Sequence, residues 1–132
     1  MKALKFILIT SLFAGFVLVS KTEANSISEQ AEIQQALSEK AKIELLIKSI
    51  SDLKGASFIR NGSSHSAKEA AEHLKKKWEY AEDDIETAAQ FIEKLASKSS
   101  ISGKAYIIRL ADGTDIMARV FLVNELRRIE SK

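Results

Sequence analysis

Residues 56–78, with the sequence ASFIRNGSSHSAKEAAEHLKKKW, decide the fold. The first five residues, 56–60, are typical of a short strand, and the Asn-Gly pair after them predicts a turn because both residue types tolerate positive φ. Ser66 and Glu69 then have the spacing of a capping box, which predicts that a helix begins there. Behind this cap, small and apolar residues repeat along one helical face: Ala67, Ala70, Ala71, Leu74 and Trp78.

Helical periodicity is also present on both sides of this stretch. Upstream, residues 28–54 predict a helix with Gly55 as its C-cap, on the pattern of Ala36, Ile43, Leu46, Ile47, Ile50 and Leu53. Downstream, Thr87 and Gln90 predict a second capping box, with an apolar face of Ala88, Phe91, Ile92 and Leu95 behind it. A final helix is expected over residues 118–130, burying Leu122, Leu126 and Ile129.

A second strand-forming region follows the serine-rich loop at residues 97–103. Tyr106, Ile108 and Leu110 alternate with other side chains as in a strand, and the Asp-Gly at 112–113 predicts a hairpin turn into residues 114–117. The expected fold class is therefore α+β and mainly helical, with about four helices packed on a small antiparallel sheet of two or three strands.

The first 24 residues have the pattern of a secretory signal peptide. A short basic start precedes an apolar run at residues 6–19, which as a helix would span about 21 Å, short of the roughly 30 Å hydrocarbon core. Thr22 and Ala24 are small residues placed for cleavage before Asn25. We therefore expect a signal peptide at 1–24, a single globular domain at 25–132 located in the periplasm, and no membrane span after cleavage.

Charge and cysteine content exclude several classes of protein. Of the 20 basic and 18 acidic residues, Lys2, Lys5, Lys21 and Glu23 lie in the leader, which leaves 17 of each sign. A general nucleic-acid binder needs a basic surplus that this domain lacks, so nucleic acid is not an expected partner. The absence of cysteine excludes disulfides and thiolate metal sites, and stability must come from packing.

Short blocks of sequence from residue 58 onward occur in the order found in a known family. The blocks are Phe58-Ile59-Arg60-Asn61-Gly62, Glu69-Ala70, His73-Leu74, Lys77, Thr87-Ala88, Phe91-Ile92, Ala96-Ser97, Ser99-Ser100, Ser102-Gly103-Lys104 and Tyr106. On these blocks the chain resembles the YfeK-like family of small exported bacterial proteins, a domain of unknown function, over about residues 43–130. The resemblance implies a compartment and a pattern of residues, but no reaction.

The chain departs from this family at three positions. Members commonly have cysteines near Ala56 and Leu110, and many have proline where Ala105 stands. If those cysteines pair in relatives, the resemblance implies that Ala56 and Leu110 are neighbours here and join the first strand to the second.

The turn after the first strand is the best candidate binding site. Arg60, Asn61 and Gly62 precede a helix N-terminus, and backbone N–H groups in such a corner favour an anion. The alternative is a structural turn. The surface expected around this corner comprises Arg60, Asn61, His65, Glu69, His73, Lys77, Ser99, Ser100 and Lys104.

Two other patterns give weaker indications. His65, Glu69 and His73 have a spacing of four and could hold zinc on one helix face, but Ser66 as N-cap leaves His65 in the turn and Glu69 in the capping box. Residues 97–104 end in Gly-Lys, yet they lack the first glycine of a phosphate loop. Such a serine run more often satisfies its own backbone. We therefore predict no metal and no cofactor.

These observations favour a non-enzymatic binding or interaction module. No nucleophile motif is present, so we assign no catalytic residue. The expected partner is a small anionic ligand or an envelope protein, the latter docking on residues 28–39 as an amphipathic helix. The alternative is an envelope-associated hydrolase that uses His73 and Glu69.

Overall fold

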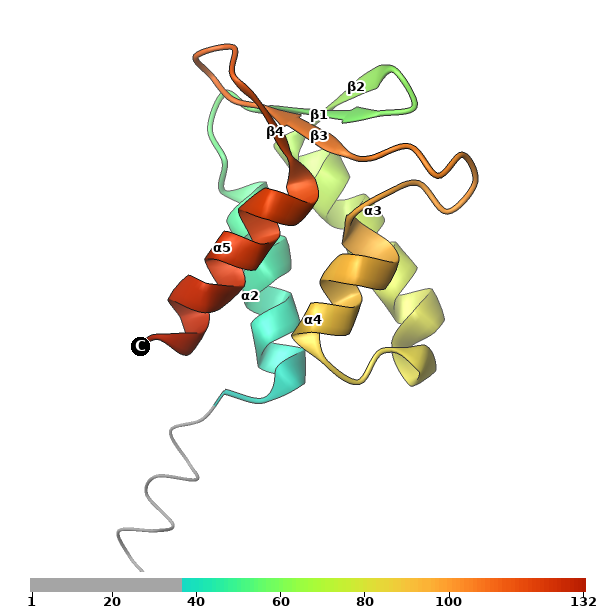
Figure 1. Ribbon diagram of the computed structural model, residues 1–132, viewed down its shortest axis with the longest axis vertical. Coiled ribbons are helices and arrows are strands. Elements are labelled where there is room, and N and C mark those ends of the chain that lie inside the picture. Colours follow the sequence, from blue (N-terminus) through green and yellow to red (C-terminus); the bar gives the residue numbers. More distant parts are fainter. Residues whose placement is uncertain (1–36) are drawn as a thin grey trace, which may run out of the picture. The chain divides into compact units, whose positions relative to one another are not determined.

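The computed structural model of the protein describes residues 37–132 (Figure 1). The helices are α2 (Glu39–Ser51), α3 (Ala67–Ala81), α4 (Ala88–Phe91) and α5 (Ala118–Glu130), with a 3₁₀ turn η1 (Glu82–Asp84) and a π-helical segment η2 (Ile92–Ala96). The strands are β1 (Ser57–Arg60), β2 (Ser63–Ser66), β3 (Ile107–Arg109) and β4 (Asp115–Met117). The α+β class and the four helices are confirmed, and the sheet has one strand more than the two or three predicted.

The four strands form an antiparallel sheet in the order β2-β1-β3-β4. Strand β2 is the one that the sequence did not predict, because its residues Ser-Ser-His-Ser look like an extension of the turn. It forms because Asn61 (φ 51°) and Gly62 (φ 79°) both adopt positive φ, as a two-residue type I′ hairpin requires. Arg60 then lies opposite Ser63, and β2 adds to the edge of the sheet.

The register of β1 and β3 bears out the neighbour relation that the family resemblance implied. Ser57 is opposite Arg109, so one further step places Ala56 opposite Leu110. The next step agrees, because a Cβ at Gly55 would lie 3.0 Å from the Cβ of Ala111. Gly55 also has φ +68°, so its place requires glycine.

Helix α3 begins as predicted. The Ser66 hydroxyl accepts a hydrogen bond from the Glu69 N–H (3.2 Å), and the Glu69 carboxylate accepts one from the Ser66 N–H (2.8 Å). Its predicted face is buried at Ala67, Ala71, Leu74 and Trp78, with Ala70 half-buried.

Helix α2 is shorter than predicted within the described part of the chain. It begins at Glu39 after the N-cap Ser38, whose hydroxyl accepts from the Ala41 N–H (3.1 Å). It ends at Ser51 instead of residue 54, because the Leu53 N–H bonds to the Ile50 carbonyl and tightens the last turn. The predicted helical residues 28–36, Ala36 included, lie outside the described residues.

The helix that starts at Ala88 changes its geometry after one turn. Thr87 caps it as predicted, accepting from the Gln90 N–H (3.1 Å), but Gln90 bonds to the Glu86 N–H, so the expected reciprocal capping box does not form. From Ile92 the segment is π-helical, and the Ser97 hydroxyl donates to the Ile92 carbonyl at 2.6 Å.

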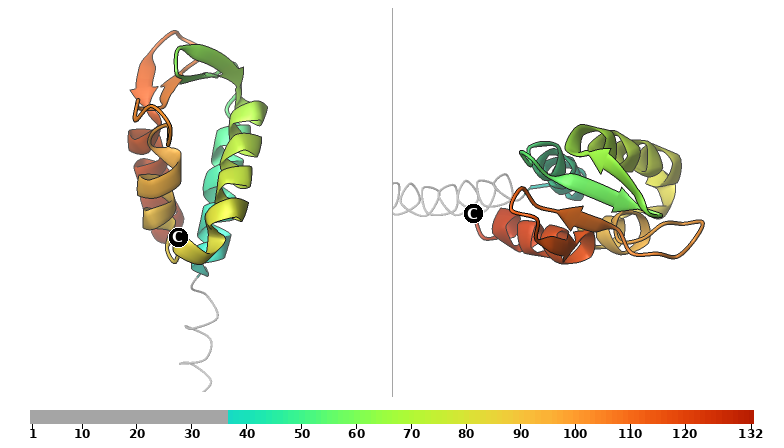
Figure 2. Two further views of the ribbon diagram at one scale, coloured as in Figure 1. Left: turned by 90° about the vertical axis from the view of Figure 1, so that its right-hand side faces the viewer. Right: turned by 90° about the horizontal axis from the view of Figure 1, so that it is seen from above.

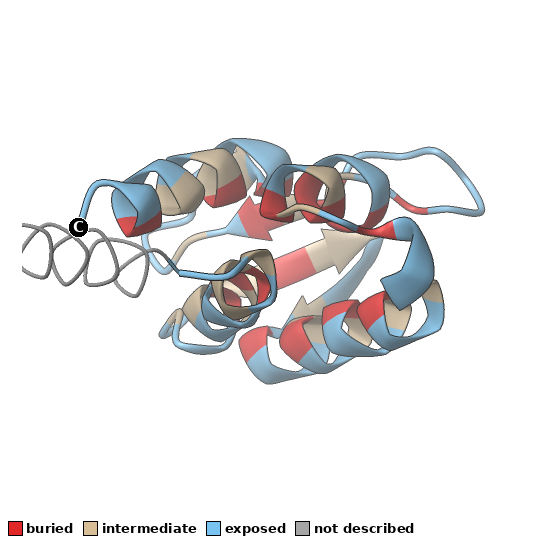
Figure 3. Cartoon of the chain, turned by 90° about the horizontal axis from the view of Figure 1, so that it is seen from below, coloured by how far each residue is buried: buried red, intermediate tan, exposed pale blue. Residues whose placement is uncertain are grey.

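All four helices lie on the same side of the sheet, with α2 and α3 forming one pair and α4 and α5 the other (Figure 2). The buried residues lie on the inward sides of the helices and sheet (Figure 3). The core is mainly aliphatic. Trp78 and Phe91 form an edge-to-face contact in it, with 6.4 Å between the ring centroids. No helix in residues 37–132 is both long and apolar enough to span a bilayer.

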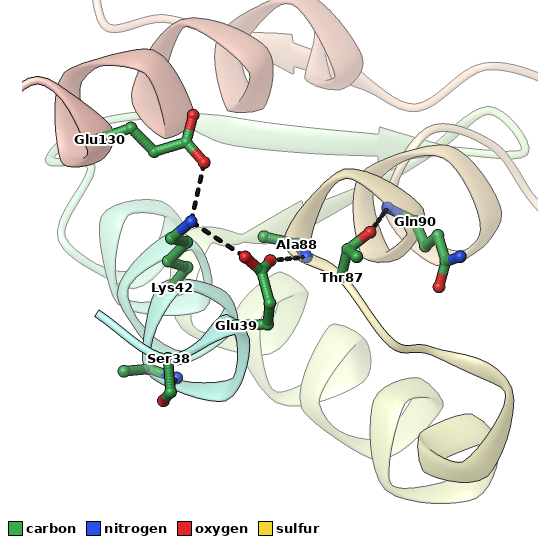
Figure 4. A network of polar contacts seen from close by, with 8 residues as sticks. Ser38, Glu39, Lys42, Thr87, Ala88, Gln90 and Glu130 are labelled. Carbon is green, nitrogen blue, oxygen red and sulfur yellow. Dashed lines mark hydrogen bonds and ion pairs between the residues drawn. The ribbon is translucent and has the colours of Figure 1, made fainter. Parts of the chain in front are cut away.

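A polar network joins three helices at the end away from the sheet (Figure 4). The Lys42 ammonium donates to carboxylate oxygens of Glu39 and Glu130, both at 2.9 Å, and so connects α2 to α5. The second carboxylate oxygen of Glu39 accepts from the Ala88 N–H (2.7 Å) and caps α4. The hydrogen bond from Ala88, followed by that from Lys42, lowers the pKa of Glu39.

Replacing Glu39 by alanine should destabilise the domain by about 1 kcal/mol, the usual cost of a lost helix cap, since an exposed ion pair adds little. Because the pKa of Glu39 is lowered on folding, this contribution is present above its ordinary value of 4.5 and is lost as the pH falls through the folded pKa. Chemical denaturation at pH 7 and pH 3 measures both effects. The control is Glu44→Ala, an exposed carboxylate of the same helix. Equal losses for the two variants would contradict the cap.

The Ala56–Leu110 register should support an engineered cross-link. Ala56→Cys combined with Leu110→Cys is expected to form a disulfide in mild oxidant, because directly opposed strand residues have suitable Cα separations. The bridge would raise the free energy of unfolding by at most about 4 kcal/mol. Ala56→Cys with Ala89→Cys on α4 is the control pair. Thiol titration after oxidation shows whether the disulfide forms, and chemical denaturation measures its effect on the free energy of unfolding. Free thiols in the first pair would show that the register is different.

Candidate functional site

A cavity of about 130 Å³ lies where the sheet meets α3. Strand residues Phe58 and Arg60 have the same parity on β1, and His65 is opposite Phe58 on β2, so all three belong to the helix-facing side of the sheet. Helix α3 contributes Glu69, Ala70, His73 and Leu74. The remaining lining residues are Ile59 of β1 and one residue from each of four other segments: Ile50, Ala96, Tyr106 and Ala118.

Arg60 and His73 meet at the edge of this cavity. The guanidinium Nη1 of Arg60 lies 2.9 Å from Nε2 and 3.0 Å from Nδ1 of His73. Both side chains are half-buried. Burial first, and then the adjacent charge of Arg60, lower the pKa of His73 below its ordinary value of 6.5. His73 is therefore neutral at pH 7, and the positive charge of this pair belongs to Arg60.

Lys77 lies one helical turn beyond His73 and is also half-buried. Its ammonium donates to the Leu95 carbonyl (2.7 Å) and to the Tyr106 hydroxyl (3.3 Å), and it lies 5.3 Å from the centroid of the Tyr106 ring. Burial, followed by the charge of Arg60, lowers the pKa of Lys77, while burial raises the pKa of Tyr106. In the part of the chain that the structure describes, every hydrogen-bond partner of this ammonium is neutral.

Within residues 37–132, neither Arg60 nor Lys77 forms an ion pair with a carboxylate. Glu69 lines the same cavity as Arg60, but its carboxylate bonds to the Ser66 N–H. That bond also lowers the pKa of Glu69 and keeps it ionised. Two half-buried cations thus lie on either side of His73 without a negative partner from the described chain.

A second, more open hollow of about 440 Å³ adjoins the first, with His73 in the lining of both. Two lysines from consecutive positions of α3 contribute to it, together with the side chain of Tyr80, which is 94% exposed. Its other lining residues are Ala81, Leu95 and Ser100, and the lysines are Lys76 and Lys77.

The serine-rich loop is held to the β1–β2 turn by its own hydrogen bonds. Ser99 is 5% exposed, and its hydroxyl accepts from the Asn61 side-chain amide (3.3 Å) and from the Ile101 and Ser102 N–H groups. The Ser102 hydroxyl donates to the Asn61 side-chain oxygen. Asn61 and Ser99 therefore position this loop, which agrees with the structural interpretation of the serine run.

His65 does not share a helix face with Glu69 and His73, because it belongs to strand β2. Its Nε2 atom is buried and has no hydrogen-bond partner among residues 37–132. In the described part of the chain no three histidine, aspartate or glutamate side chains are grouped to hold a metal ion. The residue His65 lines the cavity, but its Nε2 atom is covered by surrounding protein atoms.

The structure brings most of the nine predicted site residues to one region. Four of them line the cavity (Arg60, His65, Glu69 and His73), and two line the adjoining hollow (Lys77 and Ser100). Asn61 and Ser99 lie behind it in the loop contacts, and Lys104 lines neither hollow. Tyr106 was missed as a site residue, although its place in the family-like blocks was a signal for it.

The pair suggested for hydrolysis is not assembled as a base and its orienting group. His73 contacts Arg60, and Glu69 is engaged by Ser66, with no hydrogen bond between the two among the described residues. A neighbouring cation lowers the basicity of His73, whereas a neighbouring carboxylate would raise it.

Fold and site together define a small α+β domain with a mainly apolar cavity, lined in part by Arg60, under its sheet. The chain belongs to the family of unknown function DUF5329, whose sequence model matches residues 37–130. It is 43% identical over 68 residues to the uncharacterized protein YfeK of Salmonella typhimurium strain LT2, a match that covers 52% of this chain and 57% of that protein's length. The family expected from the sequence blocks is thus confirmed. No solved structure shows a significant match.

The contact between Arg60 and His73 predicts how the imidazole titrates. His73 should titrate below 6.5 in the folded protein, and Arg60→Gln should raise its pKa because the adjacent charge and hydrogen bond are removed. Since the unfolded state binds this proton more readily, His73 reduces stability as the pH falls below 6.5. Histidine NMR titration measures the pKa. Arg127→Gln, an exposed site on α5, is the control, and a pKa unaffected by Arg60→Gln would rule out the contact.

Proposed function

We propose that the protein is a non-enzymatic binding module of the periplasm that holds a small anionic ligand between Arg60 and Lys77. The observation that carries this proposal is the pair of half-buried cations without a carboxylate partner in residues 37–132. Removing a charge from water is costly unless an opposite charge or good hydrogen bonds replace the water. A bound anion would supply that compensation for both side chains.

The arrangement also suits an anion because of the groups around the two charges. Arg60 uses Nη1 toward His73, which leaves its other N–H groups for a planar anion. Neutral His73 provides a hydrogen-bonding group without repelling a cation. Lys76 adds a third positive side chain in the adjoining hollow. Concave, partly apolar surroundings with a few convergent polar groups are the usual form of a small-ligand site.

The compartment is part of the proposal and is supported by the leader alone. Residues 1–24 combine a basic start, an apolar run and small residues before the expected cleavage point. A docking role for residues 28–39 with an envelope protein is a separate hypothesis. Residues 28–36 lie outside the described residues, while Glu39 serves to cap α4.

Anion binding should depend on the two cations and should stabilise the fold. Phosphate and acetate are expected to raise the melting temperature of the domain and to shift the amide NMR signals of residues near Arg60 and Lys77. Lys77→Met should weaken both effects at least tenfold, because it removes the charge while retaining an apolar side chain of similar length.

The matched control is Lys75→Met, which makes the same charge change on the exposed face of α3. If Lys75→Met weakens the anion effect as much as Lys77→Met does, only nonspecific screening is present and the proposed site is wrong. Absence of any shift near Arg60 at saturating anion would lead to the same conclusion.

A further inference from the structure

The lining of the cavity beside Arg60 is more apolar than polar. A small anion without an apolar part would leave the apolar lining without contacts. The apolar lining includes Phe58, Leu74, Ile50 and the small side chains Ala70, Ala96 and Ala118. We propose that the ligand is a small organic carboxylate whose compact apolar body fills this cavity while its carboxylate lies between Arg60 and Lys77, in the proposed anion site. This inference rests on the proposed anion-binding function and specifies the chemical class of ligand.

The size of the cavity limits the body of the ligand. Its volume of about 130 Å³ is close to the ~150 Å³ of an engineered apolar cavity that binds benzene. One aromatic ring or a branched chain of similar bulk fits this space, and a long acyl chain or a sugar does not. The alanines at three positions create the space, because larger side chains there would fill it.

Arg60 provides the polar contacts for the carboxylate. It supplies the positive charge, and its contact with His73 uses Nη1, which leaves its other N–H groups as donors. Glu69 also lines the cavity, but its carboxylate is bonded to the Ser66 N–H and does not compensate Arg60.

The apolar lining and the Arg60 charge together require both parts of the ligand. A bare anion would reach Arg60 and leave the cavity to water that finds few partners there. A bare hydrocarbon would fill the cavity and leave Arg60 without compensation. Benzoate combines a ring of suitable size with a carboxylate and is therefore the probe of choice.

The decisive experiment compares benzoate, acetate and toluene by amide NMR titration of the full domain. Benzoate should bind at least tenfold more tightly than acetate, with shifts at Phe58, Leu74 and Ala96 that acetate does not cause. Toluene should bind more weakly than benzoate, because it has no group for Arg60. Equal affinities for benzoate and acetate would overturn the inference about the apolar body and leave the anion site intact.

A second experiment fills the cavity with a larger side chain. Ala70→Leu narrows the cavity from α3 and should abolish the preference for benzoate over acetate. Ala89→Leu, at an exposed position on α4, is the matched control. A benzoate preference that survives Ala70→Leu would place the ring elsewhere and overturn the inference. If no anion perturbs Arg60 or His73, the proposed function itself fails.

Discussion

The two-residue period of strand β1 is the constraint on which the site depends. Phe58 must point into the core between the sheet and the helices, and it is 7% exposed. Because alternate residues of a strand share a face, Arg60 is turned to the same side and brought beside α3. A cation is thus held at the edge of a hydrophobic core by the burial of its neighbour two residues away, and the hairpin turn that follows adds His65 to the same face.

The two ends of the domain differ in whether their charged side chains are paired with opposite charges. At the end away from the sheet, Lys42 is paired with Glu39 and Glu130, and the Glu39 carboxylate also caps α4, so charge and hydrogen bonds are satisfied. Under the sheet, Arg60 and Lys77 have only neutral partners in the described chain. The satisfied end holds the helices together and stabilises a fold whose other end tolerates uncompensated charge, as functional sites often do.

Local patterns predicted most elements because their signals lie within a few residues of each other. The capping box at Ser66 and Glu69, the Asp-Gly hairpin and the last helix from Ala118 to Glu130 all occur as expected. Strand β2 was missed because four polar residues carry little strand propensity, and pairing with β1 decides their conformation. The end of α2 and the π-helical segment were missed because single hydrogen bonds, at Leu53 and at Ser97, set them.

The sequence by itself determined the fold class, the family and the approximate list of site residues, since periodicity, caps, turn residues and ordered blocks are local properties of the chain. Tertiary structure alone decided where those residues lie and which groups they contact. It separated His65 from the helix of His73, engaged Asn61 and Ser99 in the loop, and brought Tyr106 to Lys77 across 29 positions. The physical reason is that burial and charge compensation depend on which side chains meet, and in this protein those meetings occur between segments distant in sequence.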